Sequence, residues 1–466
     1  MLIKGLSART YLGFVGVLGV FLCLTSWATP PKKLVVRLSE DLGSLDYLHE
    51  EVSPHILYQL HEGLTKVGTK GQAEPGLALA WKWDAHKKSI TFRLRKDARW
   101  SDGSALCAAD FKRSIDRIHT QHEPSLFLHF YRNIIRTEAP NCHQLTITLR
   151  EADIYFPVLL AHWVFFPTPK GTDKIYSGPY IVEKYQPNTS ISLRRNLNHY
   201  KKSRYEEVEF LFIADDATAM RLFDDGKIDI LRDPPVLERT RRKEQPEYRR
   251  FKTLVNFHLQ FAHRTGFDRQ ERCAIKNAIQ QKIHNLPKIF NDEVTAAKGF
   301  LHPAFGALKG HHANSGNRTN SQKALNKEIT ISYYAKNTHD ILMEWLQAVL
   351  KEQLKLNVNL DRIEPKQYWS KLATQPPAIF LSGTTAQFNS PKPFFMEFVS
   401  NNTANWGHYR SDSYDRAVER NDFDLANQIL LEQDCAAVPL YFRDSILFVQ
   451  TTIKDIFVNP LNFFYL

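Results

Sequence analysis

The chain has 466 residues, more than one hydrophobic core usually serves, so we expect two or three globular units. Hydrophobic residues make up 43% and charged residues 24%, proportions that exclude a disordered chain. The formal net charge is +11, but acidic residues are interleaved with basic ones, even in the most basic stretch, residues 239–252. This mixing favours a solvated surface over a nucleic-acid-binding patch.

Residues 1–28 have the pattern of a secretory signal peptide. Lys4 and Arg9 supply a positive start, and the apolar stretch that follows, residues 11–24, is shorter than the roughly 20 residues that a membrane-spanning helix needs. Small residues precede the expected cleavage point after Ala28. We therefore expect export with cleavage.

Five cysteines raise two questions. Cys23 would suit a lipid anchor only if small residues preceded it, and Phe21 and Leu22 are large, so we do not expect lipidation. Four cysteines remain in the exported chain: Cys107, Cys142, Cys273 and Cys435. In an oxidising compartment they allow two disulfide bonds in three pairings, and four buried free thiols are the alternative. No pair has the spacing of a zinc site.

The first predicted secondary structure follows from simple periodicities. Residues 34–38 form a short apolar strand, and residues 54–63 a helix that Gly63 is expected to cap. Residues 89–94 alternate apolar and polar side chains, which predicts a half-buried strand. A turn at Ser101–Gly103 and a helix beginning near Ala108 come next.

The same reasoning assigns the rest of the chain. We expect strands at 144–149, 177–182, 191–195, 208–213, 228–230, 257–261, 329–334, 356–360 and 438–441. We expect helices at 217–223, 267–279, 341–354 and 425–431, and a polar loop at 309–327. The strand, helix and strand within 329–360 predict a right-handed βαβ unit.

Several short motifs occur in a fixed order along these elements. They are Gly43–Asp46, Glu62–Leu64, the Leu-Arg, Trp, Asp-Gly and Ala-x-Asp-Phe sequence of residues 94–111, Gly178–Tyr180, Ile228–Ile230, the Asn-Trp to Tyr-Asp stretch 405–415, and Pro439–Tyr441. Together they resemble the extracytoplasmic solute-binding proteins of peptide and nickel ABC transporters. The resemblance covers nearly the whole chain from residue 34 onward.

The resemblance implies an α/β, two-lobed periplasmic-binding-protein-like fold of the type II, three-subdomain peptide-binder variety. Lobe 1 would comprise residues 34–256 plus 437–466, with an inserted subdomain at about 64–163, and lobe 2 residues 257–436. Two hinge crossings would lie near Val255 and Tyr441.

The same resemblance implies a function. The protein would be a periplasmic monomer that binds an extended peptide or other small solute between its lobes and delivers it to an ABC permease at the inner membrane. It would need no cofactor. The chain also lacks the common nucleophile, phosphate-loop and metalloprotease motifs, so we expect no catalytic residue, no metal ligand and no enzyme.

One feature of the family pattern is missing at the expected ligand site. Oligopeptide binders resembling this chain carry an Asp that pairs with the ligand's free ammonium group, and the matching position here is the neutral Gln387. Losing that charge would cost about 1 to 1.5 kcal/mol. We expect ligand contacts from Glu50, Gln387, Phe388, Trp406, Tyr409 and Tyr441. A metal chelate, a modified peptide or a sugar remains an alternative ligand, and an exported interaction or chaperone module remains an alternative function.

Overall fold

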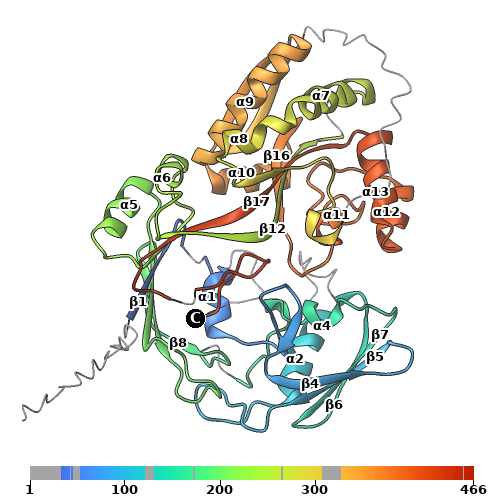
Figure 1. The fold of residues 1–466 in the computed structure, drawn as a ribbon. Helices are drawn as coiled ribbons and strands as arrows, with labels where there is room; N and C mark the ends of the chain where they lie inside the picture. Colours follow the sequence, from blue (N-terminus) through green and yellow to red (C-terminus); the bar gives the residue numbers. More distant parts are fainter. Residues whose placement is uncertain are drawn as a thin grey trace, which may run out of the picture.

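The computed structural model describes most of the chain after the N-terminal segment (Figure 1). The described residues are 33–41, 43–45, 53–120, 131–171, 174–263, 266–306, 327–454 and 456–466. The expected signal peptide, Cys23, Glu50 and most of the polar loop at 309–327 lie outside these ranges. The predictions made for them therefore stay predictions.

One large mixed sheet organises the molecule. Its order is β15-β14-β16-β12-β17-β11-β1-β10-β9-β8, and β13 pairs with β17 beside this path. The strands are β1 Lys33–Leu38, β8 Tyr180–Gln186, β9 Ser190–Arg195, β10 Glu207–Phe212, β11 Ile230–Arg232, β12 Tyr248–Phe261, β13 Val294–Ala296, β14 Glu328–Tyr334, β15 Asn357–Ile363, β16 Ile379–Thr385 and β17 Ala437–Val449. Sequence neighbours are often not sheet neighbours, so the chain crosses over repeatedly.

A four-stranded antiparallel sheet forms a separate layer, in the order β4-β5-β7-β6. Its strands are β4 Ala78–Trp83, β5 Ser89–Leu94, β6 Ile134–Asn141 and β7 Gln144–Leu149, and the hairpin β2 Thr65–Val67 and β3 Ala73–Pro75 lies beside them. The alternation in β5 is confirmed, because Ile90, Phe92 and Leu94 are buried. The turn after Trp100 is confirmed as well, and the Trp100 indole donates to Asp110 in the following helix at 3.2 Å.

Helices cover these sheets. They are α1 Pro54–Leu60, α2 Ala108–Thr120, α4 Phe156–Leu159, α5 Asp216–Asp224, α6 Val236–Arg241, α7 Arg269–Lys282, α8 Leu286–Ile289, α9 Asn337–Leu354, α10 Pro365–Thr374, α11 Pro393–Met396, α12 Asp412–Glu419 and α13 Phe423–Gln428. Short 3-10 turns occupy Trp163–Phe165, Ile283–Asn285 and Pro303–Phe305, and a π-helical turn follows α13 at Ile429–Gln433. The expected strand–helix–strand unit is present, since α9 joins the parallel pair β14 and β15.

One helix end differs from the prediction. Helix α1 stops at Leu60 because His61 already has an extended backbone, so Gly63 does not cap it. Gly63 serves close packing instead. A Cβ atom at this position would lie 3.0 Å from the carbonyl oxygen of Leu160.

Strands β12 and β17 join two halves of the molecule. One half contains β14, β15 and β16, and the other contains β1, β8, β9, β10 and β11. The long antiparallel strands β12 and β17 run side by side from the region of α7 and α9 to the region of β1 and β8 (Figure 1). Their pairing shifts register between Phe251 and Val255. The α/β class with two crossing strands agrees with expectation, whereas the limits proposed for each lobe stay a prediction.

Two disulfide bonds answer the question that the cysteines left open. Cys107, before α2, is bonded to Cys142 in the β6–β7 turn, and Cys273 in α7 is bonded to Cys435 before β17. The sequence separations are 35 and 162 residues. The second bond therefore ties the start of β17, one of the two strands that join the halves, to helix α7.

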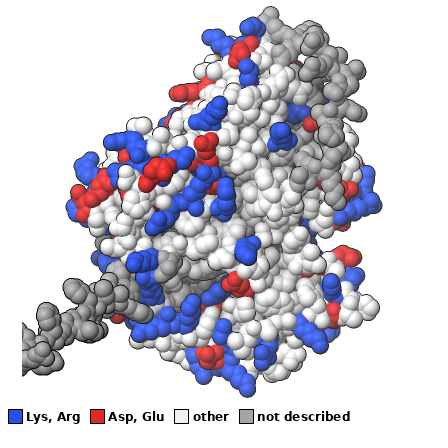
Figure 2. Space-filling model, in the orientation of Figure 1, with Lys and Arg blue, Asp and Glu red and all other residues white. Residues whose placement is uncertain are grey.

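The basic stretch 239–252 is paired with acids. Arg239 lies 3.1 Å from Glu293, Arg242 lies 2.6 Å from Asp224, and Arg250 lies 2.6 Å from Asp444. Figure 2 shows basic and acidic side chains intermixed over the visible face. The pairs of Arg242 and Arg250 agree with the expected solvated face, whereas Arg239 and Glu293 form a buried pair, with side chains 5% and 2% exposed. None of the helices in the described ranges combines the length and hydrophobicity that crossing a bilayer requires.

Candidate functional site

The two halves meet beside the crossing strands at an ion cluster. Asp233 follows β11, Lys336 lies between β14 and α9, and Arg443 lies on β17. The Lys336 ammonium and the Arg443 guanidinium each lie 3.6 Å from the Asp233 carboxylate. Asp233 has a φ of 48°, a left-handed conformation that is uncommon outside glycine. A strained backbone thus presents this carboxylate to the opposite half.

The charge of Asp233 is set by its surroundings. Burial alone would raise the pKa of its carboxyl group, but the positive charges of Lys336, Arg443, Arg232 and Arg239 hold that pKa well below its usual range. Asp233 also raises the pKa of Lys336, yet burial and the nearby arginines outweigh it and lower that pKa overall. Asp233 is therefore ionised at neutral pH, and four basic side chains surround it.

A small cavity of about 20 Å³ adjoins the cluster. Thr338, Arg239 and Arg443 line it, and within the described ranges the Thr338 hydroxyl, Arg239 Nε and Arg443 Nε have no hydrogen-bond partner. A space of this size holds about one water molecule or one polar group. The junction between the halves thus has free hydrogen-bonding capacity.

A second contact between the halves involves the segment after β16. The Asn389 side chain donates to the Lys70 carbonyl at 3.4 Å, and a Cβ atom at Gly71 would lie 2.5 Å from Asn389 Cγ. Gly71 has a φ of 81°, so this turn between β2 and β3 needs glycine for two reasons. The segment around Asn389 therefore reaches the turn of the β2–β3 hairpin.

Buried polar contacts hold the base of this segment. The Thr384 hydroxyl donates to Glu397 at 2.8 Å, and His258 Nε2 lies 2.9 Å from the same carboxylate. The Ala386 amide donates to the Leu254 carbonyl at 2.8 Å. These contacts thus hold both ends of the segment 385–396 close to β12.

Gln387 and Phe388 lie within this segment. Gln387 is partly buried, and its side chain has no hydrogen-bond partner among the described residues. Phe388 is 7% exposed and belongs to the same hydrophobic cluster as Phe394 and Phe395. A free amide beside a packed aromatic ring is compatible with the ligand-contact role predicted for Gln387.

The remaining predicted contacts do not gather around one described cavity. The Tyr409 hydroxyl donates to Asp434 at 2.6 Å, and burial raises the pKa of that phenol. Tyr441 is 1% exposed and packs between Phe257 and Phe290. Trp406 is partly buried against a third cluster. Tyr409 and Phe388 share one cluster, whereas Tyr441 and Trp406 lie in two others.

The ion cluster at the junction was missed by sequence reasoning. Its one local signal is the sequence Asp-Pro-Pro directly after β11, residues 233–235. An acid before two prolines indicates a constrained turn rather than a strand. Nothing near Lys336 indicates that it would be its partner.

Two α/β halves joined by crossing strands form an architecture that can close around a ligand by hinge motion, as in periplasmic binding proteins. The chain belongs to the bacterial extracellular solute-binding proteins, family 5, whose middle-region profile matches residues 72–406.

Relatives from several bacteria match along most of the chain. The periplasmic oligopeptide-binding protein OppA of Salmonella typhimurium is 25% identical over 88% of this chain and 87% of its own length. The dipeptide-binding protein DppE of Bacillus subtilis is 21% identical over 88% and 86%. The probable deoxycholate-binding periplasmic protein YgiS of Escherichia coli is 22% identical over 91% of each chain.

Solved structures show the same fold. The murein tripeptide binding protein MppA of Escherichia coli superposes with a TM-score of 0.78 at 20% identity, covering 93% of this chain and 97% of MppA. OppA of Haemophilus influenzae in complex with RPPGFSPFR also gives a TM-score of 0.78, at 19% identity, over 90% and 95%. The similarity covers both halves of the molecule.

Proposed function

We propose that this protein is the exported solute-binding component of an ABC importer and that it binds peptides between its two halves. The observation that carries the proposal is the junction itself, where two halves connected by β12 and β17 meet through Asp233–Lys336 and Asn389–Lys70 contacts. Relatives named for oligopeptide and dipeptide binding match along both halves. Two halves that close on a ligand are a common device for capturing solutes.

The predicted contact residues divide by exposure. Gln387 and Trp406 are partly exposed and are proposed to touch the ligand, as is Glu50. Phe388, Tyr409 and Tyr441 are nearly buried, so we propose that they shape the cleft from behind. Peptide backbone would pair with free strand edges, and water would fill space around varied side chains.

Mass spectrometry and calorimetry test this proposal together. The mature protein is purified from its own periplasm, and whatever small molecules accompany it are identified. The protein, freed of them, is then titrated with a mixture of two- to five-residue peptides. Saturable peptide binding is expected, and recovery of one non-peptide compound with no peptide binding would overturn the peptide assignment.

A non-peptide ligand is a second candidate, favoured by one residue. Gln387 supplies no charge to pair with a free ammonium group. One relative, YgiS, is named for probable deoxycholate binding. Comparing free peptides with N-acetylated peptides in the same titration separates these candidates, because only a site for a free amine should discriminate between them.

A further inference from the structure

The turn of the β2–β3 hairpin is held in one shape by its own hydrogen bonds. The Gly68 amide donates to the Gln72 carbonyl at 2.8 Å, and the Gly71 amide donates to the Gly68 carbonyl at 2.9 Å. The Gln72 side chain accepts from the Lys70 amide at 3.0 Å. These bonds fix the position of the Lys70 carbonyl, which is the group that Asn389 of the opposite half contacts.

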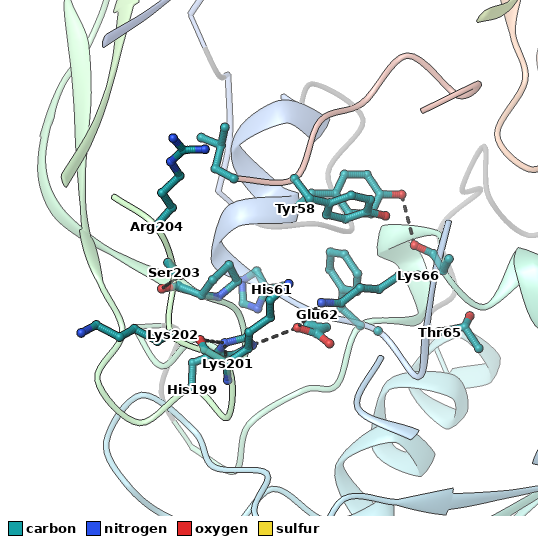
Figure 3. A pocket seen from close by; sticks show the side chains of 16 residues that line it. Tyr58, His61, Glu62, Thr65, Lys66, His199, Lys201, Lys202, Ser203 and Arg204 are labelled. Atoms are coloured by element: carbon teal, nitrogen blue, oxygen red, sulfur yellow. Dashed lines mark hydrogen bonds and ion pairs between the residues drawn. The ribbon is translucent and has the colours of Figure 1, made fainter. Parts of the chain in front are cut away.

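The start of the hairpin is anchored to α4 and to the loop after β9. The Thr65 hydroxyl donates to the Pro157 carbonyl at 2.6 Å. Glu62, buried just before β2, lies 2.9 Å from His199 Nε2 and 3.1 Å from Lys66 Nζ. Figure 3 shows Glu62, Thr65 and Lys66 where they line a cavity of about 270 Å³. The turn therefore projects from a fixed base.

Asn389 belongs to a segment that is also held in place. The Ser390 amide donates to the Phe388 carbonyl at 2.8 Å, and the Ser390 hydroxyl accepts from the Lys392 amide at 3.2 Å. Ser390 is 1% exposed, so this local turn is buried. The contact between Asn389 and the hairpin thus joins two parts of the chain that are each fixed by their own surroundings.

The two parts approach too closely for a peptide to pass between them. A Cβ atom at Gly71 would lie 2.5 Å from Asn389 Cγ and 3.0 Å from Asn389 Cβ. An extended peptide lies about 4.7–4.9 Å from each strand beside it. A ligand chain would need about twice this distance between the turn and Asn389, whereas the two are in direct contact.

This closed point lies next to the predicted ligand contact Gln387. Gln387 is partly buried and precedes Asn389 by two residues. Two residues span at most about 7 Å along the chain. A ligand whose end lies at Gln387 therefore has room beyond that end for a small group only.

We propose that the contact between Gly71 and Asn389 forms a stop at one end of the ligand cleft and limits the size of any group that extends past Gln387. This inference rests on the proposed binding of peptides between the halves. It assigns a selection by size at the amino end of the ligand, separate from any selection by charge. The favoured ligands are peptides whose amino end is free or carries a small group, not internal segments of longer chains.

Calorimetry with blocked peptides tests the proposed stop. One tripeptide is compared in three forms: with a free amino end, with an acetyl group and with a larger benzoyl group. Both blocked forms lack the ammonium charge, so the comparison between them reports size. The wild-type protein should bind the benzoyl form at least tenfold more weakly than the acetyl form. Benzoyl binding as tight as acetyl binding would overturn the stop alone, whereas no binding by any form would overturn peptide binding and the stop together.

Shortening Asn389 tests the location. Asn389→Ala removes the amide group that contacts the turn, so the benzoyl form should then bind within about threefold of the acetyl form. Asn389→Ser, which keeps a polar group, should give the same result, and both variants should bind the free tripeptide as the wild type does. The matched control Asn357→Ala removes an exposed amide at the start of β15 and should keep the wild-type ratio. An unchanged ratio in both Asn389 variants, or loss of free-tripeptide binding in both, would overturn the assigned stop.

The other end of the peptide supplies a second control. The tripeptide with a methylamide at its carboxyl end is compared with the same tripeptide carrying a larger anilide. The ratio of the two affinities should be the same in the wild type and in Asn389→Ala, because the stop acts at the amino end. A change at both ends would show that the variant loosens the whole cleft, and this result would overturn a stop at one end.

Discussion

Lys336 Nζ lies 3.6 Å from Asp233 Oδ2, although the strands that precede these residues, β14 and β11, are separated by β16, β12 and β17 in the sheet. Arg443 on β17 lies at the same distance from the other carboxylate oxygen. One acid therefore links both halves to a crossing strand. Ion pairs of this kind stabilise one relative position of the halves over others.

Asp233→Asn should destabilise the arrangement in which the halves meet. The substitution leaves Lys336 and Arg443 facing each other without a carboxylate, at an expected cost on the order of 1 kcal/mol, because Lys336 is about one-third exposed. Small-angle scattering of the ligand-free protein should give a larger radius of gyration for the variant. Asp361→Asn, which removes a pair with Lys371 inside one half, is the control and should not change the profile.

The same carboxylate predicts a dependence on pH. Its pKa is lowered in the folded protein, so its contribution to stability is complete above the unfolded pKa of about 3.9 and is lost as the pH falls below that value. The difference in unfolding free energy between wild type and Asp233→Asn should be constant from pH 7 to 5 and shrink below about pH 4. Urea titrations at these values measure it, and a difference that grows on acidification would contradict the assignment.

Gln387→Asp tests the proposed ammonium site. If the ligand is an ordinary peptide, the new carboxylate should tighten binding by on the order of 1 kcal/mol, because the buried ammonium regains a counter-charge. If the natural ligand has no free amine, the same change should weaken binding, because a carboxylate is buried unpaired. Calorimetry with free and N-acetylated peptides distinguishes the two.

The control for this experiment is Gln375→Asp, an exposed position after α10. It should leave both titrations unchanged. If Gln387→Asp behaves like this control with every ligand, then Gln387 does not contact the ligand.

Removing the long-range disulfide bond should lower stability more than removing the short-range one. Cys273 and Cys435 are separated by 162 residues, and Cys107 and Cys142 by 35. A longer loop loses more entropy when it is closed, so the double serine variants should differ by about 1 kcal/mol within a typical cost of about 2–5 kcal/mol. Urea unfolding of the two variants checks the order, and a larger loss at the shorter loop would contradict the entropic explanation.

Local patterns were enough for most elements and for the family. The alternation in residues 89–94 and the helical spacing in 341–354 predicted β5 and α9, because burial on one face imposes a period on neighbouring residues. The fixed order of short motifs along the chain was enough to indicate the fold. The predicted end of α1 was wrong, because Gly63, which resembles a helix cap in the sequence, is needed for close packing against Leu160.

Contacts between distant residues were decided by the tertiary structure alone. Three pairings of four cysteines were equally open until α7 brought Cys273 beside Cys435. Asp233 and Lys336 carry no periodic signal, and neither do Glu62 and His199. Such pairs depend on how separate elements pack, since a side chain's partner across a sheet or cavity leaves no pattern in its own stretch of chain.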